Sequence, residues 1–155
     1  MAARLNPAFS RPPEIIDLRR LTARDLGPLL EEETAAWRDE MEWDFAKSAE
    51  LVRRFVDLRA LNGSALIEDG EVAGYSYYVL EDSKALIGDV YVRRASRTVA
   101  RQNALLRQSL ISLREADCRS ASLTVTAANE DAVALYERVG FRTVRRFPAY
   151  VWEGF

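Results

Sequence analysis

The amino-acid sequence predicts a single α/β domain in which a mixed, mostly antiparallel sheet of about six to seven strands is flanked by about four helices. Three observations support this fold class. Strand-like and helix-like hydrophobic periods follow one another along the chain from residue 14 onward. Asp69-Gly70 separates two β-rich runs and is typical of a tight hairpin turn. A long helical pattern lies between two further strand-like runs, which is the order of a βαβ unit with parallel neighbouring strands.

The composition argues against several classes of protein. The chain has 155 residues, of which 48% are hydrophobic and 30% are charged, as is typical of one globular domain with a packed core. Its net charge of −2, without a dominant basic stretch, argues against nucleic-acid binding. It contains no apolar run of the roughly 20 residues that cross a bilayer and no apolar secretory signal. We therefore expect a cytoplasmic protein without a membrane partner.

The absence of histidine limits the chemistry further. Without an imidazole there is no Ser-His-Asp triad and no His-ligated zinc, and the single cysteine, Cys118, has no imidazole base to activate it. We expect no metal and no covalent intermediate. A lone cysteine cannot form an internal disulfide, which fits a reducing compartment as well as a protein that never needed one.

The first part of the chain is predicted to form an arm, a strand and a helix. Residues 1–13 contain two proline-bearing pairs and show no periodicity, so we expect a loose arm ahead of one domain at 14–155. Ile15, Ile16 and Leu18 indicate the first strand. Thr22 and Asp25 resemble a capping box that opens a helix. The residues expected on its buried face are Leu26, Leu29, Leu30 and Trp37.

A second helix and an antiparallel meander are predicted next. The helix covers residues 45–61, with Leu51, Phe55 and Leu58 on its buried face and Asn62-Gly63 at its end. The runs 65–68, 72–80 and 85–92 are predicted to be consecutive strands, joined by tight turns at 69–70 and near 82–83.

The C-terminal part is predicted to contain two helices and three strands. The buried face of the first helix is expected to consist of Val99, Leu106, Leu110 and Leu113. A strand over 122–126 follows, and Asn129 then caps a last helix that ends at Gly140. Strands over 141–144 and 149–152 close the chain.

The last helix carries the most specific motif of the sequence. From Asn129 to Phe141 the chain reads N-E-D-A-V-A-L-Y-E-R-V-G-F. This motif and the order of elements from residue 15 onward resemble the GNAT superfamily of acetyltransferases. The positions that match the family in residue type and spacing are Asn129, Ala132, Leu135-Tyr136 and Gly140-Phe141. Taken singly they are a helix cap, core residues and a helix end, whereas together they favour a function.

The resemblance implies acetyl-CoA as the cosubstrate and assigns roles to three residues. Tyr136 would protonate the departing thiolate of coenzyme A as a general acid. Asn129 would hydrogen-bond the pantetheine arm, and a backbone N–H near Val92 would stabilise the developing oxyanion. Acetyl-CoA would lie between the splayed strands that end near Val92 and Thr126.

The expected pyrophosphate loop departs from the family pattern, which is Arg or Gln, two residues of any kind, Gly, any residue, then Gly or Ala. The sequence here is Arg97-Thr98-Val99-Ala100-Arg101-Gln102. The loop and the helix start would bind the pyrophosphate through backbone N–H groups. Ala100 still allows close approach, whereas the Gln102 side chain either enters the phosphate's space or turns aside and donates from its amide. The arginines that either bind phosphates or form a solvated basic loop are Arg93, Arg94, Arg97 and Arg101.

A base that removes a proton from an attacking amine is expected to be a carboxylate or an ordered water, because the chain has no histidine. Asp89 is the first candidate and Glu33 the second. Asp89 alternates with its neighbours along a strand, so it either serves as the base or faces solvent. The aromatic residues that either line an acceptor pocket or belong to the core are Trp37, Trp43, Tyr75, Tyr77 and Tyr78.

The sequence therefore predicts an N-acetyltransferase that transfers an acetyl group from acetyl-CoA to an amine by direct attack. One alternative is a non-catalytic GNAT-like binding or dimerisation module, which the altered loop favours and the retained Asn129 and Tyr136 oppose. Another is an acyltransferase that uses a different acyl-CoA. The acceptor, a small-molecule or peptide amine, has no sequence signature. The apolar run from Tyr150 to Phe155 either forms a homodimer contact or completes the monomer's sheet.

Overall fold

The described strands form one sheet in the order β1-β2-β3-β4-β5. The computed structural model describes residues 12–150, 152 and 154. Neighbouring strands from β1 (Glu14–Asp17) through β2 (Asn62–Glu68) and β3 (Glu71–Glu81) to β4 (Lys84–Val92) are antiparallel. β5 (Ser120–Ser122) pairs with β4 in the parallel direction. The predicted meander and the predicted parallel neighbour are confirmed.

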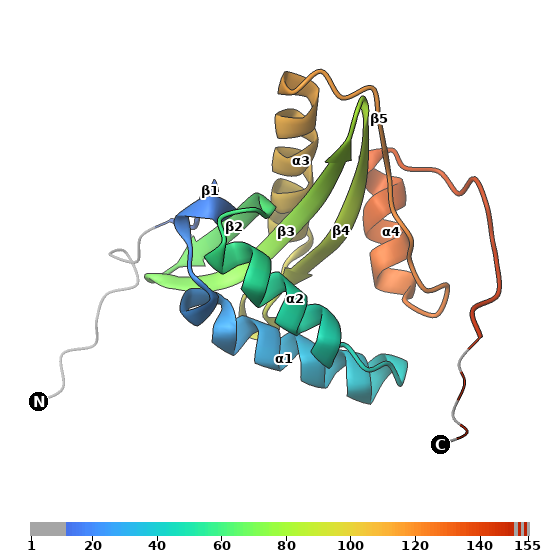
Figure 1. Cartoon of the computed structure of the whole chain (residues 1–155), viewed down its shortest axis with the longest axis horizontal. Coiled ribbons are helices and arrows are strands. Elements are labelled where there is room, and N and C mark those ends of the chain that lie inside the picture. The colour runs from blue at the N-terminus through green and yellow to red at the C-terminus, as the bar shows by residue number, and fades with distance from the viewer. Residues whose placement is uncertain (1–11, 151, 153, 155) are drawn as a thin grey trace, which may run out of the picture.

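Helices cover both faces of this sheet (Figure 1). α1 (Ala23–Met41) and α2 (Ala46–Asp57) pack on the face that includes Ala65. α3 (Val99–Glu115) packs on the opposite face, where the next residue, Leu66, points, because successive strand residues alternate between faces. α4 (Glu130–Val139) packs beside α3. Short 3-10 helices, Leu18–Arg20 and Arg94–Ser96, follow β1 and β4. The four predicted helices and the mixed α+β class are confirmed.

Local chemistry sets the boundaries of several elements as expected. The Thr22 hydroxyl accepts a hydrogen bond from the Asp25 N–H at 3.3 Å, and the Asp25 carboxylate accepts one from the Thr22 N–H at 2.8 Å, which completes the capping box of α1. The β2–β3 turn has φ values of 52° at Asp69 and 79° at Gly70, as a type I′ hairpin requires. Gly140, with φ of 114°, ends α4 in the left-handed region.

The predicted buried face of α2 is wrong. Leu51, Phe55 and Leu58 are exposed, with Leu58 keeping 67% of its surface in contact with solvent. The side chains that pack against α1 and the sheet are instead Ala49, Val52 and Val56. Both sets recur at helical spacing, and the smaller side chains allow the two helices to approach closely. A pattern with two apolar stripes does not say which stripe faces the core.

Two other element predictions need correction. α2 ends at Asp57 rather than 61, because Arg59 adopts the left-handed conformation with φ of 54°, and Asn62-Gly63 then opens β2. Val99 does not belong to the buried face of α3. It is the first residue of that helix, beyond the end of the sheet, and 52% of its surface is exposed.

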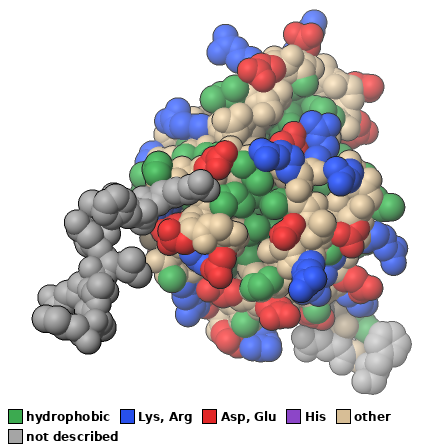
Figure 2. Space-filling view, turned by 90° about the vertical axis from the view of Figure 1, so that its left-hand side faces the viewer, with side chains coloured by type: hydrophobic (Ala, Val, Ile, Leu, Met, Phe, Trp, Pro, Cys, Tyr) green, Lys and Arg blue, Asp and Glu red, His purple; other side chains and the backbone are tan. Residues whose placement is uncertain are grey.

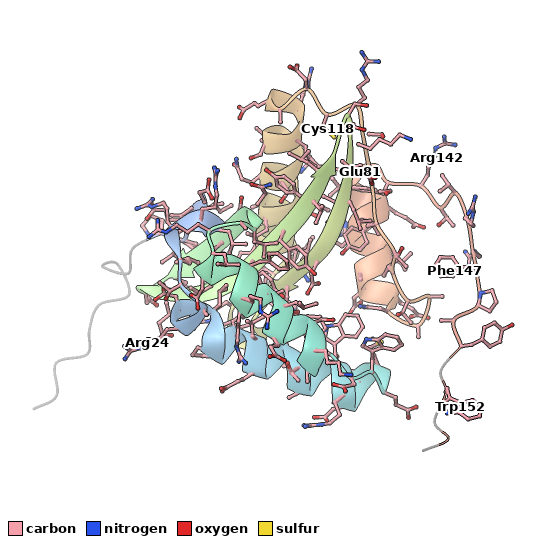
Figure 3. The ribbon with its side chains drawn as sticks, in the orientation of Figure 1. Arg24, Glu81, Cys118, Arg142, Phe147 and Trp152 are labelled. Atoms are coloured by element: carbon pink, nitrogen blue, oxygen red, sulfur yellow. The ribbon has the colours of Figure 1, made fainter. Side chains whose placement is uncertain are left out.

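The C-terminal strands were also predicted incorrectly. β5 covers Ser120–Ser122 rather than 122–126, and residues 141–150 contain no strand, so the described sheet has five strands rather than six to seven. Pro148 offers no N–H to a strand ladder, and the segment after α4 runs away from the sheet. Figure 3 shows Arg142 and Phe147 along this segment, and Phe147 is 62% exposed. Residue 151 of the predicted last strand, residues 151, 153 and 155 of the apolar run, and residues 1–11 of the predicted N-terminal arm lie outside the described residues.

The surface in Figure 2 carries acidic and basic side chains interspersed around a group of hydrophobic ones. No described helix is both long enough and apolar enough to span a bilayer.

Candidate active site

The candidate site lies where β4 separates from β5. Pairing between the two strands covers only Lys84 to Leu86 on the β4 side. Directly afterwards β4 contains a bulge: Tyr77 of β3 faces Asp89, and Tyr78 faces Ile87, so Gly88 has no partner. A methyl group at Gly88 would overlap the ring of Tyr77, and this position therefore needs glycine. The bulge bends β4 and leaves its second half open on the β5 side.

Two carboxyl groups and a phenol meet on the α1 side of this bulge. The Tyr75 hydroxyl donates to Glu33 Oε1 at 2.5 Å and lies 3.2 Å from Asp89 Oδ2. The other Asp89 oxygen, Oδ1, accepts a hydrogen bond from the Val90 N–H at 2.8 Å. Glu33 has 0% of its surface exposed, whereas Asp89 is partly exposed. The structure thus brings together both carboxylates that the sequence suggested as bases.

Burial changes the acidity of the groups around this site. Desolvation raises the pKa of Glu33 well above its usual range, and the nearby Asp89 carboxylate raises it further. Desolvation also raises the pKa of Asp89, although hydrogen bonds from Glu33 and Tyr75 oppose the rise. Burial, together with the field of Asp89 and Glu33, raises the pKa of Tyr77 to about 12. A carboxylate with a raised pKa is a better-matched base near neutral pH than an ordinary aspartate.

Tyr136 of α4 lies within the electrostatic field of this carboxyl pair, and Asn129 caps the same helix. Burial raises the pKa of Tyr136, and the charges of Asp89 and Glu33 raise it further, so its hydroxyl stays protonated at neutral pH. The ring packs edge-on against Phe141 with 5.9 Å between centroids. Asn129 caps α4, and its Oδ1 accepts a hydrogen bond from the Ala132 N–H at 3.3 Å. Its side-chain amide makes no hydrogen bond within the described chain.

The loop between β4 and α3 offers a small set of backbone donors. Thr98 caps α3, and its hydroxyl accepts a hydrogen bond from the Arg101 N–H at 3.1 Å. The Gln102 N–H donates to the Thr98 carbonyl, also at 3.1 Å. The first N–H groups of a helix have no intrahelical partner, so those of Val99 and Ala100 point out of α3. They lie at the positive end of the helix dipole, where an anion gains about 0.3–1 kcal/mol. The Gln102 side chain is half-buried one position beyond this first turn.

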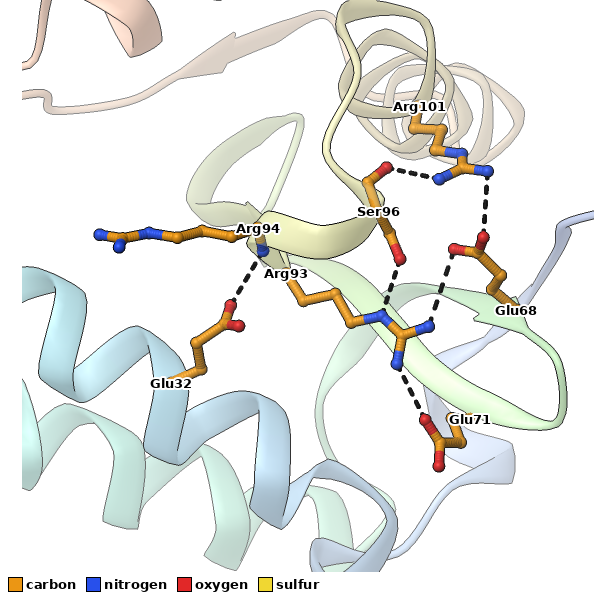
Figure 4. A network of polar contacts seen from close by, with 7 residues as sticks. All are labelled: Glu32, Glu68, Glu71, Arg93, Arg94, Ser96 and Arg101. Atoms are coloured by element: carbon orange, nitrogen blue, oxygen red, sulfur yellow. Dashed lines mark hydrogen bonds and ion pairs between the residues drawn. The ribbon is translucent and has the colours of Figure 1, made fainter.

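The arginines of the loop form a network with acidic residues of the β2–β3 hairpin (Figure 4). Arg93 donates to Ser96 Oγ at 2.7 Å and to Glu71 Oε2 at 2.9 Å. Arg101 donates to the Ser96 carbonyl at 2.6 Å and to Glu68 Oε1 at 3.2 Å. These contacts hold the loop against β2 and β3. Sequence reasoning did not identify Glu68, Glu71 and Ser96 as partners of these arginines. No spacing pattern links the β2–β3 hairpin to a loop so far along the chain.

The remaining arginines are also engaged. Arg97 Nε donates to the Val92 carbonyl at 3.0 Å, and its guanidinium lies 5.2 Å from the centre of the Tyr91 ring. The Arg94 N–H donates to Glu32 Oε2 at 3.2 Å, and its guanidinium forms an ion pair with Glu40 of α1. Tyr91 also donates to Glu32 Oε2, at 2.7 Å. Glu32 therefore ties the loop to α1, a role that sequence reasoning did not assign.

The five aromatic candidates for an acceptor pocket lie in different parts of the structure. Tyr75 is buried and stacks with Tyr77 at a ring distance of 6.0 Å, beside the carboxyl pair. Trp37 stacks with Phe45, and Trp43 is largely exposed nearby. Tyr78 lies on the α3 face and lines a polar cavity of about 410 Å³ between β1, β2 and α3. This cavity shares no lining residue with the candidate site.

No group of three or more potential metal ligands occurs among the described residues. The reactive groups that the structure gathers are carboxyls, phenols and backbone N–H groups. Such a set can accept a proton, donate a proton and bind an anion.

Comparisons with known proteins agree with this geometry. A model of the Acetyltransferase (GNAT) family matches residues 18–141. No curated protein sequence matches the chain. A GNAT-family acetyltransferase from Staphylococcus aureus Mu50 has a similar structure, with a TM-score of 0.73, 16% identity, and coverage of 90% of this chain and 94% of that one.

Two further similar structures were solved with coenzyme A bound. The PaiA N-acetyltransferase from Thermoplasma acidophilum has a TM-score of 0.67 and 16% identity, with 85% of this chain and 91% of that one covered. The aminoglycoside N-acetyltransferase AAC(6')-Iy has a TM-score of 0.68 and 12% identity, with coverage of 97% and 100%. At such identities, these likenesses establish the shared fold.

Proposed function

Because the chain belongs to the GNAT acetyltransferase family, we propose that it transfers an acetyl group from acetyl-CoA to an amine by direct attack on the thioester. The observation that carries this proposal is the opening of β4 away from β5 at Gly88. Asp89 lies beside this opening, and the field of its carboxylate reaches the Tyr136 hydroxyl of α4. A proton acceptor beside the opening and a proton donor on α4 therefore lie within each other's electrostatic field.

In the proposed reaction, the Asp89 carboxylate takes a proton from the acceptor's ammonium group, directly or through one water. The free amine then attacks the thioester carbon, and a backbone N–H near Val92 stabilises the negative charge that develops on oxygen. The carbon–sulfur bond breaks, and Tyr136 gives its proton to the leaving sulfur. The proton that the new amide nitrogen loses returns the phenol to its starting state. No enzyme nucleophile takes part, in keeping with a chain that has no histidine.

The proposed cofactor contacts use backbone groups more than side chains. The N–H groups of Val99 and Ala100 would bind the pyrophosphate, and the free amide of Asn129 would bind the pantetheine arm. Arg97 and Arg101 lie beside this position, but both already bond within the protein. Thr98 caps the first turn of α3, and the Gln102 N–H donates to the Thr98 carbonyl just beyond it. The loop can therefore bind a diphosphate, with fewer hydrogen-bond donors than a glycine-rich loop offers.

The acceptor in this proposal is a small-molecule or peptide amine. A cytoplasmic location, suggested by composition, stays a prediction. The homodimer contact at the C-terminal run likewise stays a prediction, with Tyr150 and Trp152 both exposed.

Calorimetric titration with acetyl-CoA tests the proposed site before any acceptor is known. We expect micromolar binding, about −8 kcal/mol, that weakens in Asn129→Ala. Gln102→Gly serves as the matched loop variant. If the parent does not bind and Gln102→Gly does, the loop has closed the site and the non-catalytic binding module becomes the better account. Titration with longer acyl-CoA esters distinguishes an enzyme that prefers another acyl group.

A further inference from the structure

The buried carboxyl pair presents a charge problem that the protein must solve. Glu33 is fully buried, and within the described chain no arginine or lysine forms an ion pair with Glu33 or Asp89. The Tyr75 hydroxyl lies 2.5 Å and 3.4 Å from the two Glu33 oxygens and 3.2 Å from Asp89 Oδ2. A phenol has one proton, so it donates fully to only one of these three oxygens. Two ionised carboxylates here, one of them fully buried, would lie side by side without a counter-ion.

We propose that Glu33 and Asp89 work as one unit that holds a single proton, with Glu33 as the protonated member, Asp89 as the base and Tyr75 as the positioning residue. This inference rests on the proposed function for the role of Asp89, but the shared proton itself does not depend on turnover. In this arrangement the Glu33 carboxyl donates to Asp89, and Tyr75 donates to Glu33 Oε1.

The contacts of the two carboxyls indicate which one keeps the proton. Asp89 accepts a hydrogen bond from the Val90 N–H at 2.8 Å, which favours its charged form, and it is less completely buried than Glu33. Glu33 has no backbone donor within the described chain and no exposed surface. The neutral form is therefore less costly at Glu33 than at Asp89.

The groups that face the pair from each neighbouring element are neutral or acidic. Tyr75 and Tyr77 come from β3, Tyr91 from β4 and Tyr136 from α4, and the pKa of each phenol is raised, with burial as the largest cause and a carboxylate of the site contributing. On α1, Glu32 is bonded to Tyr91 and to the Arg94 N–H, and Trp37 donates to Glu33. None of these groups supplies a positive charge, so the proton must reside on the pair.

This arrangement has a defined consequence for the reaction. When Asp89 takes a proton from the acceptor's ammonium group, the pair becomes neutral and holds two protons. One proton must return to water before the next cycle, through Asp89, the less buried member of the pair. Two strongly interacting carboxyls titrate in two steps that belong to the pair.

Carbon-13 NMR of protein labelled at the side-chain carboxyl carbons of Asp and Glu tests the proposal without an acceptor. The Glu33 signal is assigned by its loss in Glu33→Gln, with Glu31→Gln, an exposed position on the same helix, as the control. We expect Glu33 to titrate at a higher pH than the exposed glutamates. Asp89→Asn should lower that midpoint, because it removes the neighbouring negative charge. A Glu33 signal that titrates with the exposed glutamates would overturn the proposal.

Tyr75→Phe tests the positioning role. It should raise the Glu33 midpoint further, since the phenol's hydrogen bond favours the charged carboxylate, whereas Tyr77→Phe removes a matched hydroxyl that makes no hydrogen bond in the described chain. An unchanged midpoint in a folded Tyr75→Phe protein would refute this role. If Tyr75→Phe does not fold, Asp89→Asn alone decides whether the proton is shared. Failure to acetylate any amine, with the predicted titration observed, would count against the proposed function alone.

Discussion

Removal of the Tyr75 hydroxyl should lower the free energy of unfolding, because this hydroxyl contacts both carboxyls of the pair. In Tyr75→Phe, Glu33 loses a 2.5 Å hydrogen bond inside a region with no solvent access. The ring stays the same size, so core packing is kept. Asp89 loses a longer contact, at 3.2 Å.

The expected cost follows from the burial of the group left behind. A buried polar group that loses a partner costs about 1–3 kcal/mol; this carboxyl has 0% exposure but keeps its contacts with Trp37 and Asp89, so we expect a cost near the middle of that range. With a urea m-value of about 1–3 kcal/mol/M, a loss of about 2 kcal/mol lowers the unfolding midpoint by about 1 M.

Urea unfolding followed by circular dichroism measures this effect, with Tyr77→Phe as the control. Tyr77 stacks on Tyr75 and is partly buried, but its hydroxyl makes no hydrogen bond in the described chain. Its removal should change the free energy of unfolding by less than about 0.5 kcal/mol. Equal midpoints for the two variants would show that the Tyr75 hydrogen bonds do not stabilise the fold.

Three further predictions concern the pair, the bulge and the corrected helix face. Because burial raises the pKa of Glu33 above its ordinary 4.5, the stability of the parent relative to Glu33→Gln should be greatest below pH 4.5 and fall as pH rises through the folded pKa; denaturation across pH measures this. Gly88→Ala should destabilise by about 1–3 kcal/mol, because its methyl overlaps an aromatic ring, whereas Gly27→Ala, in open space on α1, should stabilise by about 0.5–1 kcal/mol. Thermal unfolding that ranks these two glycine variants in the opposite order would contradict the bulge geometry. Val52→Ala on α2 should cost at least about 1 kcal/mol, and Leu58→Ala at the C-cap of α2 less than about 0.5 kcal/mol, in the same assay; the reverse order would support the buried face predicted from sequence.

Those parts of the fold that depend on neighbouring residues could be predicted from the sequence. The capping box at Thr22, the hairpin at Asp69-Gly70 and the helix end at Gly140 each involve contacts within a few positions. The face of α2 could not be predicted, because two apolar stripes compete and only packing against α1 decides between them. The short β5 depends on a bulge in another strand, which local alternation does not reveal.

The candidate site shows the same division. The motif around Asn129 and Tyr136 was readable because its residues share one helix. Asp89 and Glu33 could be listed as separate bases, but their meeting through Tyr75 required the packing of α1 on the sheet. The contacts of Glu68 and Glu32 with the loop between β4 and α3 could not be predicted either, since hydrogen bonds and ion pairs between distant segments leave no spacing pattern.

Acetyl-CoA-dependent release of free thiol, measured with a panel of primary amines, tests the central claim most directly. We expect the parent to release thiol with at least one amine, and Asp89→Asn and Tyr136→Phe to reduce kcat by about 10²–10⁴. Calorimetry on the same samples should show that both variants still bind acetyl-CoA. Variants that bind acetyl-CoA and turn over at the parent's rate would contradict the placement of the base and the acid at the opening of β4.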